Sequence, residues 1–232
     1  MSGVLQLHGL PCSSGHRTSP ISGLHSRCRA ASLRPHRGCV VAVRAAAETK
    51  PFKVPSWDVA FDYLTRQKDF SSTPAEEVHE AVKAGKVVLV DVRPSKAYEA
   101  GHPQGAVSVQ IYQQTDFSKP SFTRYLKAFA LMANGVQPVE PNPDFMVQLK
   151  QASGNKAVCL MCETGGSLVP NPSFPTGKTS RSLQATHRAV QSGDYPDVLH
   201  LKGGVSGWAR AGLPFDGDYD PSAAGRTPGV VE

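Results

Sequence analysis

The residue with the strongest chemical signal is Cys162, which ends an apolar run and stands directly before a turn. The run Ala157–Met161 has the continuous apolar composition of a strand that is buried on both faces. Gly165 and Gly166 follow in a turn where backbone N–H groups can converge on an anion. Because ligands of open α/β sheets bind at the carboxyl ends of the strands, this position predicts a reactive thiol beside an anion site.

A second part of this site is expected downstream, where Ser180, Arg181 and Ser182 begin a predicted helix. The partial positive charge of a helix N-terminus and a guanidinium both favour the ionised form of a nearby thiol. A thiolate that forms at neutral pH is a nucleophile. The competing interpretation is that Cys162 is an inert, small apolar residue at the end of a strand.

Helical and strand patterns alternate along the rest of the chain. Helices are expected over residues 74–85, 122–135, 142–149 and 182–191, and strands over residues 87–90, 106–109, 157–161 and 198–201. The connections are too long for hairpins, so the pattern predicts an α/β fold with a mostly parallel sheet covered by helices. Thr73 and Pro74 form the start signal of the first of these helices, with Thr73 as the N-cap. Trp57, Phe61 and Leu64 have the spacing of a short amphipathic helix that docks on the domain.

The net charge of +6 is concentrated at the front of the chain. Residues 1–50 hold seven Lys and Arg but one acid, so the charges of the remaining residues balance. A balanced domain gives no basis for nucleic-acid binding. No apolar run approaches the roughly 18 residues of a membrane-spanning helix, and five cysteines are too few for a disulfide-rich scaffold.

Residues 1–47 are typical of an organelle transit peptide, because they are rich in Arg and Ser, poor in acids and lack a hydrophobic block. Their last stretch is similar to a stromal processing site, which favours the chloroplast, in the stroma or at the thylakoid surface. The alternative is a disordered tail. We expect a linker and short helix over 48–72, one domain over 73–215, and a loose tail over 216–232.

Five motifs in a fixed order give this domain a family resemblance. They are Asp91-Val92-Arg93, residues 98–106, the C-x-x-G pattern of residues 162–165, residues 180–182 and residues 201–208. Together they resemble the rhodanese-like (sulfurtransferase) domain, and in particular the single-domain plastid proteins with an extended active-site loop. The resemblance implies a five-stranded, mostly parallel sheet with helices on both faces, and a site without a metal or organic cofactor.

The same resemblance implies a sulfurtransferase reaction at Cys162. The thiolate would take a sulfane sulfur from thiosulfate or a related anionic donor, become a persulfide, and pass the sulfur to a thiol acceptor or cyanide. Backbone N–H groups after the cysteine would stabilise the persulfide, and a guanidinium would neutralise the donor. The residues assigned to this substrate binding are Gly165, Gly166, Arg181 and Ser182.

Three further residues of the motifs are interpreted as structural support. Asp91 and Arg93 are expected to form a polar pair that fixes the turn after the first strand. His102 is expected to bond to the backbone of its own loop rather than to act as a base. Trp208 is expected to lie in the core.

The interval between Cys162 and Arg181 departs from the family pattern. The common pattern C-x-x-G-x-R-S places the arginine in the same short loop, whereas here it comes nineteen positions after the cysteine. The inserted residues 167–179 contain three prolines and either fold out as a flap or block the pocket. Glu163 adds a negative charge that would disfavour the thiolate and repel thiosulfate. We expect segments 112–141 and 167–179 to set the choice of acceptor or protein partner.

Other functions fit parts of the pattern. Cys159 and Cys162 form a C-x-x-C pair, which is typical of thioredoxin-like redox sites. On one strand, however, the two side chains would face opposite sides and could neither form a disulfide nor share a zinc ion. A cysteine phosphatase of this fold needs a short closed loop of five residues between Cys and Arg, and the longer interval here forbids such a loop unless the insertion bulges away. The main alternative is a non-catalytic rhodanese-like module that binds a protein partner or senses a small anion in the chloroplast.

Overall fold

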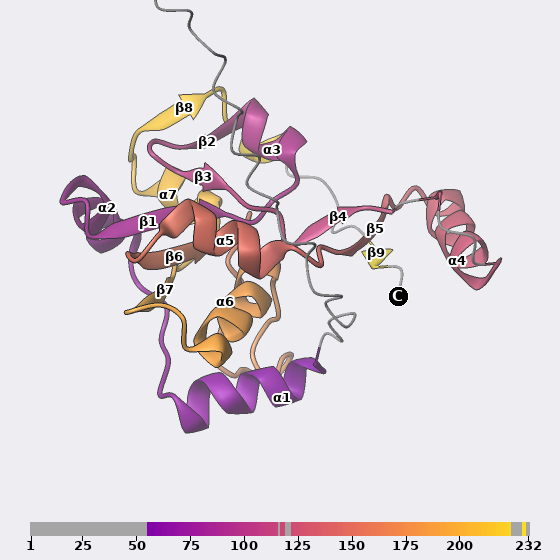
Figure 1. Cartoon of the computed structure of the whole chain (residues 1–232), viewed down its shortest axis with the longest axis horizontal. Coiled ribbons are helices and arrows are strands. Elements are labelled where there is room, and N and C mark those ends of the chain that lie inside the picture. Colours follow the sequence, from indigo (N-terminus) through magenta and orange to yellow (C-terminus); the bar gives the residue numbers. More distant parts are fainter. Residues whose placement is uncertain (1–54, 116, 119–121, 224–228, 231–232) are drawn as a thin grey trace, which may run out of the picture. The chain divides into compact units, whose positions relative to one another are not determined.

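The computed structural model describes residues 55–115, 117–118, 122–223 and 229–230, so the predicted transit peptide, residues 1–47, lies outside the described residues. A parallel sheet forms the centre of the domain. Its strands are β1 (Val87–Asp91), β3 (Val107–Ser108), β6 (Ala157–Met161) and β7 (Val198–His200), in the order β3-β1-β6-β7 (Figure 1). The two central strands, β1 and β6, pair over five residues. The predicted α/β fold with a parallel sheet is confirmed.

The sheet has four strands rather than the expected five, and Thr73 accounts for the difference. Thr73 forms a single parallel bridge at the end of β7, with its N–H donating to His200 O at 2.8 Å and its carbonyl accepting from Lys202 N at 2.9 Å. Pro74 follows as the N-cap of α2 (Ala75–Lys83), and the chain turns into the helix at Ala75, so the pairing stops after one residue. Thr73 is therefore not a helix cap; the N-cap residue is Pro74, without a side-chain cap.

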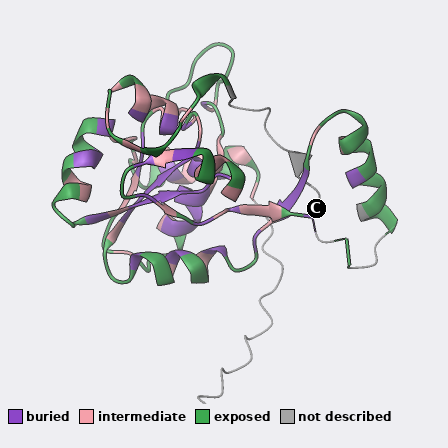
Figure 2. Ribbon diagram, turned by 90° about the horizontal axis from the view of Figure 1, so that it is seen from above, coloured by how far each residue is buried: buried purple, intermediate pink, exposed green. Residues whose placement is uncertain are grey.

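Helices cover both faces of the sheet, as expected. α5 (Phe145–Ser153) and α6 (Arg181–Ser192) pack on one face, and α2 and α7 (Gly204–Arg210) pack on the other. The alternation of side chains along the strands supplies both cores: β6 contributes Val158 and Leu160 to the first face, and Cys159 and Met161 to the second. Figure 2 shows buried residues gathered on the central strands, with exposed residues on the outer sides of the helices.

Two smaller sheets extend the domain. β2 (Gly101–Pro103), which follows α3 (Ser95–Ala100), pairs with β8 (Phe215–Gly217), while β4 (Tyr112–Gln114), β5 (Pro138–Pro141) and β9 (Gly229–Val230) form the other sheet. α4 (Phe122–Ala133) is inserted between β4 and β5. The C-terminal segment differs from the predicted loose tail, because it contains most of β8, a 3-10 helix (Pro221–Ala223) and β9. Its Tyr219 stacks on Phe215 with ring centroids 5.0 Å apart.

The segment before the domain folds onto it. α1 (Trp57–Asp62) continues directly as a π-helix (Tyr63–Gln67), which matches the predicted amphipathic helix. Leu64 is fully buried against Leu168 of the inserted loop and against α6. The indole Nε1 of Trp57 donates a hydrogen bond to Thr176 O at 2.8 Å. α1 and the π-helix therefore hold the inserted residues 167–179 against the domain.

Candidate active site

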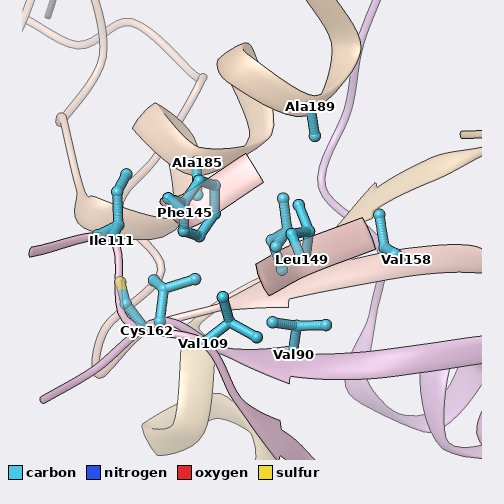
Figure 3. Close-up of a cluster of buried hydrophobic side chains, with 11 residues drawn as sticks. Val90, Val109, Ile111, Phe145, Leu149, Val158, Cys162, Ala185 and Ala189 are labelled. Carbon is cyan, nitrogen blue, oxygen red and sulfur yellow. The ribbon is translucent and has the colours of Figure 1, made fainter. Parts of the chain in front are cut away.

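Cys162 follows the last residue of β6, where the strand gives way to the loop that leads to α6. The residue is 4% exposed and belongs to the apolar cluster on the α5–α6 face, where Ile111 also lies (Figure 3). Its Sγ accepts a hydrogen bond from Ser182 Oγ at 3.1 Å. Ser182 is the second residue of α6, so the thiol lies at the N-terminal end of that helix. The positive end of the helix dipole favours a thiolate at this place.

The loop after Cys162 turns sharply at two glycines. Gly165 and Gly166 both have a φ of +72°, a conformation that side chains rarely adopt. A Cβ on Gly165 would stand 2.7 Å from the backbone N of Gly204, and one on Gly166 would stand 2.5 Å from Lys178 O. The backbone N–H groups of residues 163–166 have no hydrogen-bond acceptor among the described residues. These donors are therefore available to an anion.

Arg181, the first residue of α6, is half-buried near the thiol. Burial lowers the pKa of its guanidinium, and the charge of Cys162 partly offsets this effect. Within the described part of the chain, the guanidinium forms no ion pair and no hydrogen bond. A cation in this state at a helix N-terminus is suited to bind an anionic ligand. The fold therefore brings Arg181, Ser182 and Cys162 together despite the insertion between them.

A buried charge network supports the loop from the end of β1. Arg93 donates from Nε to both carboxylate oxygens of Asp91, at 3.1 and 2.9 Å, and from Nη2 to Gly101 O at 2.7 Å. Its Nη1 binds Glu163 Oε2 at 2.8 Å. Burial alone would lower the pKa of Arg93, but the charges of Asp91 and Glu163 outweigh burial and raise it. Arg93 is thus a permanent cation that joins β1 to the loop after Cys162.

The sequence predicts that the Glu163 carboxylate repels an anionic sulfur donor. In the structure, this carboxylate is instead bound by side chains of the protein. Besides Arg93, Tyr219 Oη donates to Glu163 Oε1 at 2.5 Å, and Ser206 Oγ donates to the same oxygen at 3.3 Å. With a guanidinium 2.8 Å away, the negative charge of Glu163 is largely compensated within the protein. The expected repulsion of an anionic donor is correspondingly weaker.

His102 and Trp208 contribute to the framework of the domain. The His102 Nδ1 atom lies 2.8 Å from Tyr98 O, and the His102 ring stacks on Tyr98 with centroids 3.7 Å apart. Trp208 is fully buried in the core on the α2–α7 face, and its Nε1 donates to Pro214 O at 2.9 Å. Both side chains are engaged with the protein itself.

The second cysteine, Cys159, lies on the opposite face of β6 from Cys162. It is fully buried, and burial raises the pKa of its thiol. The two thiols are free, and their separation across the sheet agrees with the geometry expected for this C-x-x-C pair. In the part of the chain that the structure describes, no group of three or more His, Cys, Asp or Glu residues is placed to hold a metal ion. Nor does a helix there have the length and apolarity to cross a membrane.

The inserted residues 167–179 form a narrow loop. Ser167 bridges to Lys178, and Asn171 bridges to Phe174, both in antiparallel fashion. Because the loop closes on itself at the Ser167–Lys178 bridge, the chain re-enters the site just before α6. The choice between a flap and a blocked pocket stays a prediction.

Ser180 connects this loop to the helix. Its Oγ accepts from Leu183 N at 3.2 Å as the N-cap of α6, and donates to Gly165 O at 2.7 Å. The same hydroxyl therefore fixes both the start of the helix and the glycine turn after Cys162. This double contact positions Arg181, the next residue in the chain.

Two side chains beside the site were not assigned a role from the sequence. His200 Nε2 lies 2.9 Å from Ser182 Oγ, and Tyr219 binds Glu163. His200 had a detectable signal, since a histidine inside an apolar strand must find a hydrogen-bond partner when it is buried. Tyr219 had none, because it comes from the C-terminal segment and meets the site only through the β2–β8 pairing.

Comparisons with known proteins place these residues in a wider context. The family model described as the Rhodanese-like domain matches residues 74–211, which include Asp91, Arg93, Cys162, Arg181 and His200. The chain is similar to Rhodanese-like domain-containing protein 14, chloroplastic, of Arabidopsis thaliana, with 30% identity over 190 residues that cover 81% of this chain and 83% of that protein. It is also similar to Thiosulfate sulfurtransferase 16, chloroplastic, of the same plant, with 27% identity over 145 residues, or 62% of this chain and 91% of that protein.

Solved structures with a similar arrangement include the thiosulfate sulfurtransferase from Pseudomonas aeruginosa. The TM-score is 0.40 and the identity 19%, over 72% of this chain and 23% of that chain, so the match spans under a quarter of the bacterial protein. A rhodanese-related protein from Thermoplasma volcanium matches with a TM-score of 0.37 and 14% identity, over 63% of this chain and 98% of that chain.

Proposed function

The chain belongs to the rhodanese-like domain family, and from this premise we propose that it is a sulfurtransferase that carries a sulfane sulfur on Cys162. The observation that carries the proposal is the position of the thiol. Its Sγ accepts a hydrogen bond from Ser182 Oγ at 3.1 Å, at the N-terminal end of a twelve-residue helix. Both the hydroxyl donor and the helix dipole stabilise a thiolate, which is the reactive form in sulfur transfer.

In the first half-reaction, the Cys162 thiolate attacks the outer sulfur of thiosulfate or a related donor. The sulfur–sulfur bond of thiosulfate breaks, its electron pair leaves with sulfite, and Cys162 becomes a persulfide whose outer sulfur carries the negative charge. No proton needs to move in this step. The protein therefore contributes mainly a nucleophile and an environment that tolerates the anion.

Two groups support the binding of that anion. The first is the set of N–H groups of residues 163–166, which have no acceptor within the described residues. The second is Arg181, whose guanidinium is close enough to Cys162 for their charges to interact. We assign these groups, with Ser182, to the donor and the persulfide.

In the second half-reaction, an acceptor thiolate attacks the outer sulfur and the bond to Cys162 Sγ breaks. The acceptor leaves as a persulfide, and the Cys162 thiolate forms again. Because the residue is 4% exposed, an acceptor must approach a sulfur atom that is nearly covered by the protein. A small thiol, or a partner that docks next to the inserted loop, satisfies this condition.

The partner surface is assigned to segments 112–141 and 167–179. α4, which lies in the first segment, exposes five large apolar side chains, and the exposed Val169 and Phe174 lie in the second. The five on α4 are Phe122, Tyr125, Leu126, Phe129 and Met132. The names of both relatives describe those proteins as chloroplastic, which supports the chloroplast as the proposed location of this chain.

A second candidate function is a non-catalytic rhodanese-like module. The low exposure of Cys162 and the exposed apolar face of α4 favour it, because binding a partner needs no accessible thiol. A sulfur-transfer assay with thiosulfate or 3-mercaptopyruvate as donor and cyanide or a small thiol as acceptor separates the two functions. The enzyme turns over and loses all transfer in Cys162→Ser, with nearly unchanged stability, whereas Cys159→Ala keeps it. A folded wild-type chain without turnover for any of these donors identifies the module.

A further inference from the structure

A continuous hydrogen-bonded chain runs from the Cys162 thiol through the core to Ser72. Ser182 Oγ lies 3.1 Å from Cys162 Sγ, His200 Nε2 lies 2.9 Å from Ser182 Oγ, and Ser72 Oγ lies 2.8 Å from His200 Nδ1. Ser182 and His200 are fully buried. The sulfur is therefore connected, through Ser182, to two further groups, His200 and Ser72.

The direction of this chain follows from the Ser182 hydroxyl, which donates to Cys162 Sγ. That donation uses its one proton, and Ser180 Oγ, 3.2 Å away, gives its own proton to Gly165 O, so the Ser182 oxygen accepts from His200. His200 then carries its proton on Nε2, and its Nδ1 is an acceptor that binds the hydroxyl of Ser72. Every donor in the series points toward the sulfur, which is the arrangement that stabilises a negative charge on it.

The imidazole is held in its neutral form at physiological pH. Burial lowers the pKa of His200 to about 4, and a hydrogen bond to the Gly165 backbone offsets this only in part. The charged groups around the thiol are Arg181 on α6, which interacts with Cys162, and the Asp91 and Glu163 carboxylates, which act on Arg181. None of these groups takes the place of His200 Nε2 as the hydrogen-bond donor to Ser182 Oγ.

We propose that His200 is a positioning residue that acts through Ser182, with Ser72 fixing its tautomer, to hold a hydroxyl proton on Cys162 Sγ. The inference rests on the proposed role of Cys162 as the nucleophile. The interaction matters most when acceptor attack breaks the sulfur–sulfur bond, because the electron pair then returns to Sγ and the hydroxyl stabilises the departing thiolate. In the persulfide, by contrast, Sγ is uncharged and accepts only a weak hydrogen bond.

The test is the pH dependence of Cys162 alkylation by iodoacetamide in the full chain. In His200→Leu, the midpoint of the rate curve moves upward by about one pH unit, and the rate below the midpoint falls about tenfold. His200→Gln, whose side-chain N–H can reach Ser182, recovers most of the wild-type curve. His79→Leu replaces another buried histidine, one that packs on Trp208 far from the thiol in the fold, and leaves the curve unchanged.

Steady-state kinetics add a readout that a purely structural role does not move. His200→Leu lowers kcat while the donor KM stays near the wild-type value, because Arg181 and the loop amides are intact. Should His200→Leu fail to fold, Ser72→Ala provides the test, with a smaller upward shift of the alkylation midpoint. Identical alkylation curves for wild type and the folded His200 or Ser72 variants overturn the proposal, and so does a His200→Gln curve that equals that of His200→Leu.

The sulfur-carrier role of Cys162 and the positioning role of His200 are contradicted by different results. Alkylation needs only the thiol, so a shifted midpoint supports the positioning role even if neither thiosulfate nor 3-mercaptopyruvate donates sulfur. Persulfide formation together with an unshifted midpoint supports the proposed function and rejects the role of His200.

Discussion

Arg93 binds the carboxylate of Glu163, the residue next to the candidate nucleophile, with Nη1 2.8 Å from Oε2. The same guanidinium also binds Asp91, so one buried cation serves two carboxylates from different parts of the chain. The side chain of Arg93 is 3% exposed and that of Asp91 is fully buried. Ion pairs of Arg93 thus connect the loop after Cys162 to the end of β1. Because Arg93 and Asp91 are buried, water cannot easily replace these contacts if one partner is removed.

Removal of that cation should therefore be costly. Arg93→Ala leaves the carboxylates of Asp91 and Glu163 uncompensated, and we expect the free energy of unfolding to fall by about 3–5 kcal/mol. Urea denaturation at pH 7 measures the loss. The matched control is Arg66→Ala, which breaks an exposed ion pair to Asp62 and should cost less than about 1 kcal/mol. Equal losses in the two variants would contradict this role of Arg93.

Arg181 is expected to act on the donor rather than on stability. Because its guanidinium has no partner among the described residues, Arg181→Ala should raise the donor KM by roughly tenfold or more, with a smaller change in kcat. The measurement is initial-rate kinetics over a range of thiosulfate or 3-mercaptopyruvate concentrations. Arg210→Ala, on the exposed end of α7, serves as the control and should leave KM unchanged. Equal kinetics for the Arg181 variant and wild type remove this residue from the site.

The buried His200 makes stability depend on pH. Its pKa is about 4 in the folded chain, below the ordinary value of 6.5, so the unfolded chain binds a proton more readily. Stability is therefore full above pH 6.5 and falls as the pH drops toward 4, by roughly 3 kcal/mol. Burial also lowers the pKa of His187, which acts in the same direction. Urea midpoints at pH 7 and 4.5 measure the loss, and a drop just as large in His200→Gln would assign it to other groups.

The helical segment before the domain should protect the inserted loop. Leu64 is fully buried, and Leu64→Ala is expected to destabilise the chain by about 2–5 kcal/mol. The same variant, and to a lesser degree Trp57→Phe, should speed proteolytic cleavage within residues 167–179, because the anchors of the loop are lost. Val59→Ala, at a position that is 59% exposed on the same helix, is the control. Cleavage elsewhere, or at unchanged rates, argues against this bracing role.

The parts of the fold that the sequence predicted have a pattern that can be read from neighbouring residues. β1 and β6 are buried on both faces, so their residues form continuous apolar runs that stand out from their surroundings. α4 was recognised from its helical spacing although its apolar face is exposed, because periodicity does not depend on what covers the helix. Cys162 was found because the end of a buried strand is a defined place in such a fold.

The missed features depend on contacts between distant residues. β4 and β5 are short and contain polar or proline residues, so their pairing is set by the chain around α4 rather than by a strand pattern. The fifth strand stopped at one residue because α2 begins at Ala75, a detail that a family resemblance does not contain. The partners of Glu163 and the chain from Ser72 to Cys162 depend on the three-dimensional fold, since each joins residues from separate elements.

The most direct test is mass spectrometry of the Cys162 peptide after the full chain has been incubated with thiosulfate or 3-mercaptopyruvate. We predict a gain of one sulfur atom on that peptide, which a later incubation with a small thiol removes. The Cys159 peptide should stay unmodified in the same digest. An unmodified Cys162 peptide from folded protein, with either donor, would contradict the assignment of Cys162 as a sulfur carrier.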